Sequence, residues 1–271
     1  MVCGNVVLAF AQNSQGRHLV ALDRLKGTLL WQTASPVGEC VVSRTERIVH
    51  TWQRVDGGGS QLVSLDCGTG EITRIFEQVP VQKIAGSANL GAFGGKLYWT
   101  NAGRTLTVLN AATGGIEWSV DLPGGAESAA TQTDGTRIYV ARNTGLRAFD
   151  WRTGELAWSV EYENCSPLGL VPLLAADSGR VVVARRRRGG VGALSCHDPE
   201  TGELAWEHGT LSPVNSLSVS RNVFVRCDRL YALGGTSGRV LWCADVDGCS
   251  PLHVDGGLLI SPVQLLLDRE M

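Results

Sequence analysis

The chain has 271 residues, of which 44% are hydrophobic and 18% are charged, and 34 of them are glycines. This composition argues against a mainly helical protein and predicts an all-β fold of short strands joined by tight turns. The net charge of -2 excludes a global field that would gather nucleic acid or an anionic membrane surface, so any such binding must be local.

The first ten residues carry no basic segment, and the apolar run from Val6 to Phe10 is too short for a signal sequence or a membrane span. We therefore expect a cytoplasmic protein. In a chain of this length without an export signal, the eight cysteines are expected to be reduced, buried thiols.

One sequence frame returns along most of the chain: Leu, two residues, Leu, Asp, three residues, Gly, three residues, Trp. The copies occupy residues 19–31, 62–74, 106–118, 146–158, 194–206 and 230–242. Intervals of about 40 residues are typical of propellers and solenoids. The glycines that the copies share are Gly27, Gly70, Gly114, Gly154, Gly202 and Gly238.

The copy at 146–158 shows how a repeat is expected to fold. Residues 137–141 and 146–149 predict two strands joined by a turn, and residues 155–160 predict the outer strand. Between the strands at 146–149 and 155–160, Asp150 opens a turn that its side chain can cap, and Gly154 supplies the positive φ that closes the turn. Small-residue stretches such as 168–176 and 213–220 predict the innermost strand, where strands of neighbouring blades converge.

A tryptophan follows the shared glycine by four residues in five of the copies. An indole at this place can pack on the neighbouring blade while its N–H finds a carbonyl, so we predict a structural role between blades rather than ligand stacking. Arg74 interrupts the series, which predicts the weakest seam between the second and third blades. The tryptophans concerned are Trp31, Trp118, Trp158, Trp206 and Trp242.

The pattern Ala-x-Asp-x-x-Thr-Gly-x-x-x-Trp resembles the repeat of the pyrroloquinoline-quinone-like β-propellers, from Leu19 to Trp242. The resemblance implies antiparallel four-stranded blades and gives the five tryptophans the task of docking adjacent blades. The WD40 repeat is a poorer match, because its Gly-His and Trp-Asp dipeptides do not recur in phase.

Counting predicted strands gives seven blades in a single domain, 1–271, with incomplete first and last blades; six blades is the alternative. The first blade is expected to start at Val6 without its innermost strand, and residues 250–268 form a partial terminal repeat. Two incomplete ends suggest a piece of a longer polypeptide.

The resemblance to quinoproteins implies a quinone beside calcium, held by carboxylates, with adjacent cysteines nearby. No two cysteines are neighbours here, and no spacing of Cys and His is typical of zinc. The five histidines are scattered, and no nucleophile elbow or complete phosphate loop occurs. We therefore predict no catalytic residue, no cofactor and no metal.

The only long charge run is Arg185, Arg186, Arg187 and Arg188, between the second and third strands of the fifth blade. A turn could present these arginines to phosphate, an acidic protein or RNA. The alternative is a solvated hairpin tip without a partner.

A second hypothesis concerns the mouth of the axial funnel. The stretches 164–168 and 248–252 both read Cys-Ser-Pro-Leu after one variable residue, which indicates either duplicated blades or a shared position at the mouth. In the second case a small polar pocket would combine Glu39, Cys40, Glu127, Cys165, Asn215 and Cys249.

Three functions stay open at this stage. The preferred one is a non-catalytic scaffold or sensor module, monomeric or part of a longer polypeptide, that binds a protein or small ligand without contacting membrane. By resemblance, such propellers accompany bacterial Ser/Thr kinases and envelope-protein assembly. The alternatives are a propeller enzyme, including a quinone-dependent dehydrogenase, and nucleic-acid or acidic-partner binding through Arg185–Arg188.

Overall fold

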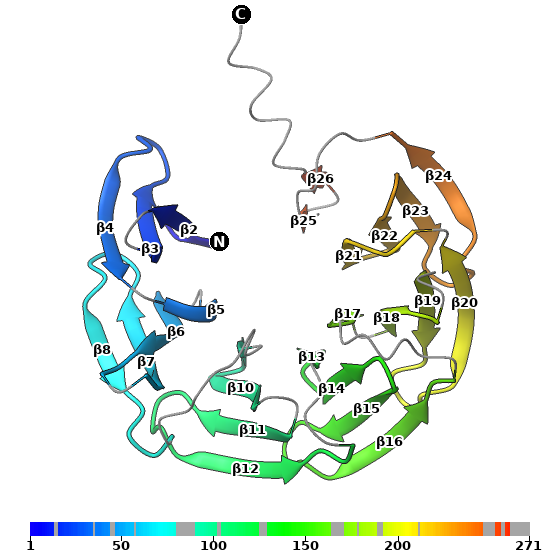
Figure 1. Cartoon of the computed structure of the whole chain (residues 1–271), viewed down its shortest axis with the longest axis horizontal. Helices are drawn as coiled ribbons and strands as arrows, with labels where there is room; N and C mark the ends of the chain where they lie inside the picture. Colours follow the sequence, from blue (N-terminus) through cyan, green and yellow to red (C-terminus); the bar gives the residue numbers. More distant parts are fainter. Residues whose placement is uncertain are drawn as a thin grey trace, which may run out of the picture. The chain divides into compact units, whose positions relative to one another are not determined.

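All regular elements in the computed structural model are β-strands (Figure 1). The structure describes residues 1–13, 16–34, 36–43, 47–56, 58–79, 90–101, 104–124, 129–163, 171–177, 179–188, 192–210, 212–245, 253–255 and 258–260. Within these ranges no helix is long and apolar enough to cross a membrane. The chain divides into two compact units, Met1–Glu127 and Ser128–Met271, which are taken in turn.

The first unit contains three antiparallel four-stranded sheets, each built from strands consecutive in the sequence. In the first sheet the strands are β1 (Val2–Cys3), β2 (Val6–Asn13), β3 (Gly16–Asp23) and β4 (Leu29–Ala34). The second has β5 (Pro36–Ser43), β6 (Ile48–Arg54), β7 (Ser60–Asp66) and β8 (Ile72–Ile75). The third has β9 (Leu90–Phe93), β10 (Lys96–Asn101), β11 (Thr105–Asn110) and β12 (Ile116–Asp121).

The second unit contains three more sheets of the same kind and one strand pair. The first two sheets comprise β13 (Ala130–Thr133), β14 (Arg137–Arg142), β15 (Gly145–Asp150) and β16 (Leu156–Glu161), then β17 (Leu173–Asp177), β18 (Arg180–Arg186), β19 (Gly192–His197) and β20 (Leu204–Thr210). The last sheet has β21 (Ser216–Val219), β22 (Asn222–Arg226), β23 (Leu230–Gly234) and β24 (Val240–Ala244). The pair is β25 (His253–Asp255) and β26 (Leu258–Ile260).

These sheets confirm the predicted all-β architecture of four-stranded antiparallel blades. The prediction that the first blade lacks its innermost strand is wrong, because β1 pairs with β2 through Val2 with Val7 and Cys3 with Val6. A strand of two residues is too short to show alternation in the sequence. The six four-stranded sheets agree with the alternative count of six, and β25 and β26 lie in the predicted partial repeat. The single-domain assignment stays a prediction.

Each outer strand is preceded by the predicted turn. In the turn at Asp150, the carboxylate Oδ1 accepts hydrogen bonds from the backbone N–H groups of Arg152 at 2.8 Å and Thr153 at 2.9 Å. These bonds hold the pKa of Asp150 below its usual range. Gly154 closes the turn at φ 75°, a conformation that glycine adopts without strain. Asn110 caps its own turn with the same two bonds, so an amide replaces the carboxylate there.

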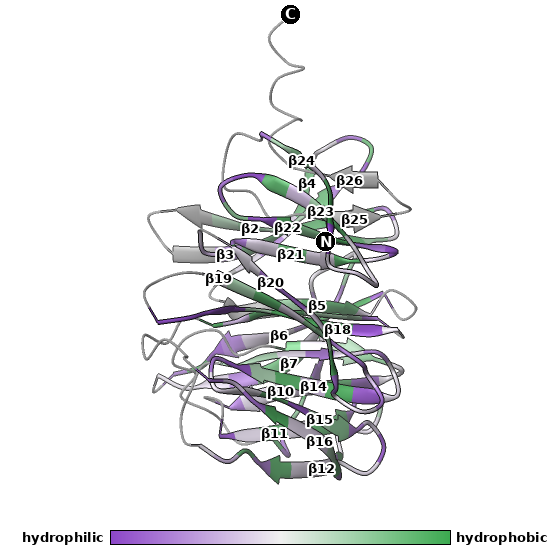
Figure 2. Cartoon of the chain, turned by 90° about the vertical axis from the view of Figure 1, so that its right-hand side faces the viewer, coloured by the Kyte–Doolittle hydropathy of each residue, from purple (hydrophilic) through white to green (hydrophobic). Residues whose placement is uncertain are grey.

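The core of each unit lies between neighbouring sheets. Alternate residues of β18 face opposite ways: Val181 and Val183 belong to the cluster shared with the β13–β16 sheet, whereas Val182 and Ala184 pack with β21–β24. Because both faces of the strand are covered, its sequence is an unbroken apolar run. Hydrophobic residues lie mainly on the strands and hydrophilic ones in the turns between them (Figure 2).

Three indoles make the same contact with the following sheet. Trp31, Trp158 and Trp206 each donate their Nε1–H over 3.0 Å to a carbonyl in the next turn, that of Cys67, Pro199 and Gly235 respectively. Each ring lies on the shared glycine of that turn. A Cβ atom added there would come within 2.5 Å of the ring at Gly70, and within 2.6 Å at Gly202 and Gly238.

Other positions of the series differ from these three. Trp242 is 44% exposed, compared with 8% for Trp206, so among the described residues it is not covered as the prediction requires. Trp118 is half-buried. At Arg74, the guanidinium and Phe76 lie near Gly114 instead of an indole.

The seam that Arg74 was predicted to weaken contains an aromatic pair that the sequence analysis did not anticipate. Trp52 on β6 and Trp99 on β10 are fully buried, with ring centroids 5.7 Å apart in an edge-to-face arrangement. Such a pair stabilises a core beyond the area that it buries. The second and third sheets are therefore joined by a contact of a different kind.

The first and second sheets are joined covalently, which corrects the expectation of reduced thiols throughout. Cys3 on β1 and Cys67 after β7 form a disulfide, with their Cα atoms 6.6 Å apart and both residues fully buried. Their separation of 64 residues gave no local signal of pairing. Among the described cysteines, Cys40, Cys196 and Cys227 are buried thiols and Cys243 is an exposed one.

We expect Cys3→Ser with Cys67→Ser to lower the free energy of unfolding of the first unit by about 4 kcal/mol, because the cross-link restricts the unfolded chain. Urea unfolding followed by tryptophan fluorescence measures the change. Cys243→Ser is the control and should leave the midpoint unchanged. An equal midpoint for the double variant and the wild-type protein would show that the disulfide does not stabilise this seam.

The contact between indole and glycine predicts unequal effects of one substitution at two turns. Gly238→Ala should destabilise by about 3 kcal/mol, because positive φ disfavours alanine and its Cβ meets the Trp206 ring. Gly27→Ala should cost only about 1 kcal/mol, since Gly27 has a similar φ but nothing within 4 Å of an added Cβ. Equal losses in chemical denaturation would contradict a role for the indole.

Candidate interaction surface

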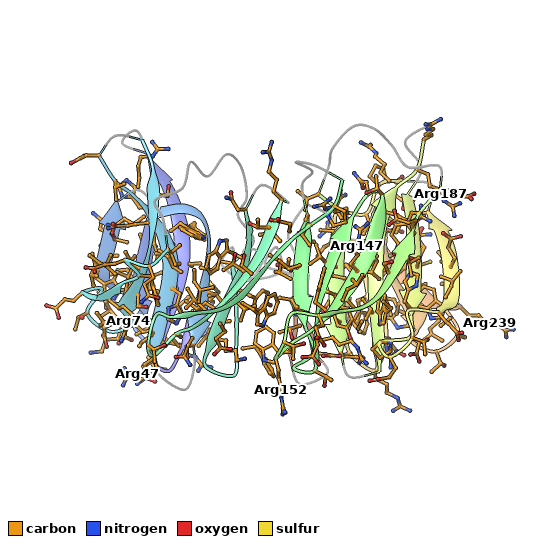
Figure 3. The ribbon with its side chains drawn as sticks, turned by 90° about the horizontal axis from the view of Figure 1, so that it is seen from below. Arg47, Arg74, Arg147, Arg152, Arg187 and Arg239 are labelled. Atoms are coloured by element: carbon orange, nitrogen blue, oxygen red, sulfur yellow. A yellow bond between two sulfur atoms is a disulfide. The ribbon has the colours of Figure 1, made fainter. Side chains whose placement is uncertain are left out.

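The candidate site lies at one end of the sheets in the second unit. In an antiparallel sheet of four consecutive strands, the hairpin between the second and third strands lies at the same end as the C-terminal end of the fourth strand. The hairpins β14–β15, β18–β19 and β22–β23 define this end, here named the hairpin rim. Figure 3 shows Arg187 at this edge, and Arg152 and Arg239 at the opposite edge.

The four consecutive arginines differ in exposure, so the simple picture of a solvated hairpin tip is incomplete. Arg185 and Arg186 belong to strand β18, and Arg185 is only 9% exposed. Arg186 and Arg187 are half-buried, whereas Arg188 is exposed. The strand therefore fixes the first two residues of the run, and the turn presents the last two.

One carboxylate serves two of these arginines. The Oε1 atom of Glu207, on β20, lies 2.8 Å from Nη2 of Arg185 and 2.6 Å from Nη2 of Arg187. Glu207 pairs across the sheet with Ser195, so β20 places it beside the arginines. A single negative charge shared by two guanidinium groups leaves this group of three side chains with one excess positive charge.

A polar network holds Arg185 from its other side. Its guanidinium carbon stacks 4.3 Å from the ring centre of Tyr162, the residue that follows β16. The Tyr162 hydroxyl lies 3.1 Å from Nε2 of His197 and 3.4 Å from Oγ of Ser195, both on β19. These polar contacts share one face of the β17–β20 sheet with the apolar cluster that contains Val181 and Val183.

The network contains a buried histidine that is held neutral. Burial lowers the pKa of His197; a hydrogen bond between Nδ1 and the Gly202 carbonyl, at 2.9 Å, acts in the opposite sense. The positive charge of Arg185 lowers the pKa further. A neutral imidazole adds no charge to the cationic rim.

Two hollows flank the end of the β17–β20 sheet. The smaller, about 40 Å³, is lined by Asn143, Arg185, Arg186 and the prolines Pro172 and Pro213, among others. The larger, about 190 Å³, lies between β17–β20 and β21–β24. Its walls combine apolar and polar side chains, namely Leu194, His208, Thr210, Val225, Cys227, Asp228, Tyr231 and Leu233, with Gly209.

The larger hollow is lined by side chains that can take part in hydrogen bonds. Burial, together with a hydrogen bond to Asp228, raises the pKa of the Cys227 thiol to about 11, so the thiol is protonated at neutral pH. The same bond lowers the pKa of Asp228, whose Oδ1 lies 3.5 Å from the Tyr231 hydroxyl. A protonated thiol is a poor nucleophile, so these groups are suited to hydrogen bonding.

The quinoprotein resemblance implies a metal ion, and such an ion needs several oxygen, nitrogen or sulfur ligands in one place. Across the described residues, no group of three His, Cys, Asp or Glu side chains is arranged to hold a metal ion. We therefore derive no chemistry through such a group.

The predicted funnel-mouth pocket stays a prediction. Cys40, in the first unit, is buried with its Sγ 3.9 Å from Sδ of Met1. Asn215, in the second unit, is exposed and donates from Nδ2 to the Cys227 carbonyl at 3.4 Å. Glu39 lies on β5, but its side chain is outside the described part. Glu127, Cys165 and Cys249 also lie outside the described residues.

Sequence reasoning located the arginine run but missed the residues that organise it. Glu207 and Tyr162 each lie about 20 residues from Arg185, on other strands, and nothing local marks them as its partners. The register of the strands is what brings Glu207 close to Arg185. When β18, β19 and β20 are aligned, Arg185, Ala193 and Gly209 lie side by side, and Glu207 is two residues before Gly209 on β20.

Comparisons with known proteins agree on the fold. Residues 18–221 match the family described as "Outer membrane protein assembly factor BamB". The crystal structure of BamB from Moraxella catarrhalis is similar with a TM-score of 0.66 and 19% identity, over 93% of this chain and 77% of that one. No match is found among curated proteins.

Two further structures widen the range of functions found on this fold. A europium-containing methanol dehydrogenase has a TM-score of 0.61 and 13% identity, over 93% of this chain and 69% of that one. The WD40 β-propeller domain of Doa1 has a TM-score of 0.64 and 12% identity, over 93% and 83%. Identities this low show the fold alone, which is a β-propeller.

Proposed function

Because the chain belongs to the pyrroloquinoline-quinone-like repeat β-propeller family, through its match to the BamB assembly factors, we propose that it is a non-catalytic scaffold that binds a protein partner. The hairpin rim of the second unit is the proposed binding surface. The preferred partner carries an acidic segment.

The observation that carries this proposal is the arrangement of charge at β18–β19. Arg186, Arg187 and Arg188 follow a buried arginine, and Glu207 pairs with Arg185 and with Arg187. Arginines held by a strand and a short hairpin lose little conformational entropy when they bind a carboxylate. A cationic patch on a rigid support suits an acidic protein surface.

The larger hollow offers the apolar contact that the arginines do not provide. Binding energy at protein interfaces concentrates where a side chain enters a desolvated pocket near a polar rim. Leu194, Val225 and Leu233 form an apolar wall in the hollow of about 190 Å³, on the other face of the sheet that carries the arginines. We infer that one apolar side chain of the partner enters this hollow while neighbouring acidic residues contact the arginines.

The compartment in which the protein works can also be inferred. The sequence indicates the cytoplasm, but the Cys3–Cys67 disulfide is of a kind that persists in oxidising compartments. The description of the matched family as an outer membrane protein assembly factor points the same way. We therefore propose an oxidising compartment as the working environment.

Fluorescence anisotropy with a labelled octapeptide that alternates Glu and Leu tests the proposed function. Arg186→Glu with Arg188→Glu should weaken binding at least tenfold, or about 1.4 kcal/mol, by removing two favourable charges and adding two unfavourable ones. The matched control is Arg152→Glu with Arg239→Glu, which makes the same charge change at the opposite edge.

Three results would contradict the proposal. One is no measurable binding of the peptide, and a second is an equal loss in the control pair, which would mean that net charge alone drives binding. The third is tighter binding of a single-stranded oligonucleotide than of the peptide, with a steep salt dependence, which would favour nucleic acid.

A further inference from the structure

We propose that Arg185 is the anion-binding residue of a carboxylate subsite in the smaller hollow of the hairpin rim. This inference rests on the proposed function and specifies it: the subsite accepts one Asp or Glu side chain of the acidic partner.

The first observation is that Arg185 is only partly satisfied although it is buried. Its Nη2 atom bonds Glu207, but its Nε and Nη1 atoms have no hydrogen-bond partner among the described residues. Buried polar groups are nearly always paired, and leaving a charged donor without an acceptor costs about 1–3 kcal/mol or more. An incoming acceptor would remove that penalty.

The second observation is the hollow itself. At about 40 Å³ it exceeds the space needed for a single water molecule, and its lining includes Asn143, Arg185 and Arg186. Pro172 and Pro213 have no backbone N–H and contribute apolar wall. Weak solvation strengthens the attraction between a guanidinium group and an anion that enters such a space.

The size and charge of the subsite favour a carboxylate over phosphate. Glu207 already neutralises part of the charge of Arg185, so the remaining attraction suits a singly charged group. The hollow is small, and a planar carboxylate needs less room than a tetrahedral phosphate. Inorganic phosphate is therefore the comparison ligand in the test.

Two neighbours hold the guanidinium group in place for this task. Tyr162 covers one face at 4.3 Å, and Glu207 bonds one nitrogen at 2.8 Å. The group is thus oriented before the ligand arrives, which reduces the entropic cost of binding. Tyr162 and Glu207 are positioning residues, and neither is assigned a direct contact with the ligand.

The test is an NMR titration of arginine Nε–Hε resonances in the full chain, with sodium acetate at constant ionic strength. We expect a saturable shift of the Arg185 resonance, no shift at the control Arg152, and a smaller response to inorganic phosphate. Parallel, non-saturating shifts of both arginines would overturn the proposal, and so would tighter binding of phosphate than of acetate.

A variant that is expected to bind acetate more tightly provides a second test. Glu207→Gln removes the competing negative charge but keeps a side-chain oxygen that can accept the bond from Arg185, so it should tighten acetate binding by about tenfold, or 1.4 kcal/mol. Glu203→Gln changes the net charge equally, but at the turn before β20, and should have no effect. Unchanged or weaker binding in Glu207→Gln would contradict the proposal.

The Glu-Leu octapeptide separates this inference from the proposed function. Suppose that Arg185→Gln binds the peptide as well as the wild-type protein does, while Arg186→Glu with Arg188→Glu does not bind it. The proposed carboxylate subsite at Arg185 is then wrong, and the proposed binding surface at the hairpin rim is supported. If acetate saturates Arg185 but the peptide does not bind, the surface is wrong. If Arg185→Gln does not fold, the wild-type titration decides the subsite alone.

Discussion

The packing of an indole on a glycine in the next sheet is the interaction on which the rest of the structure depends. It requires two things of the sequence at once: a turn whose last residue tolerates positive φ and has no side chain, and a tryptophan at the matching place on the preceding outer strand. Gly70, Gly202 and Gly238 meet the first requirement, and Trp31, Trp158 and Trp206 meet the second. The N–H of each of these three indoles then donates to a carbonyl of the same turn, so these three donors are satisfied.

The candidate surface appears where the apolar packing rule is relaxed. Where the β17–β20 sheet faces β13–β16, an apolar cluster is combined with the polar contacts of Tyr162, His197, Arg185 and Glu207. Polar networks in a core are costly unless every group is paired. The Nε and Nη1 atoms of Arg185 are among the buried polar atoms of the described residues that have no hydrogen-bond partner, and Arg185 also lines a hollow, which is why the binding proposal is centred there.

The repeat explains why the fold could be predicted from the sequence. Five of the six copies place an Asp or Asn, all six a glycine and five a tryptophan at fixed offsets, and each of these residues has a local physical task in a turn or on an outer strand. The features that the sequence did not reveal depend on contacts between distant residues. Cys3 and Cys67 meet only because β1 packs beside the second sheet, and Trp52 meets Trp99 across a seam that contains no repeated indole.

Only part of the candidate surface could be predicted from the sequence. The run from Arg185 to Arg188 is visible in the sequence, but its division into a buried arginine and more accessible ones follows from where β18 ends. The sequence could not show that Glu207 pairs with this run, because that contact depends on the register of β19 and β20.

Hydrogen–deuterium exchange of the tryptophan indole N–H groups, resolved by NMR, tests the central interaction most directly. If the indole contacts join the sheets, the N–H groups of Trp31, Trp158 and Trp206 should exchange slowly, and that of Trp242, which is 44% exposed, should exchange at the rate of a solvent-exposed indole. Equally fast exchange at all four positions would contradict the account.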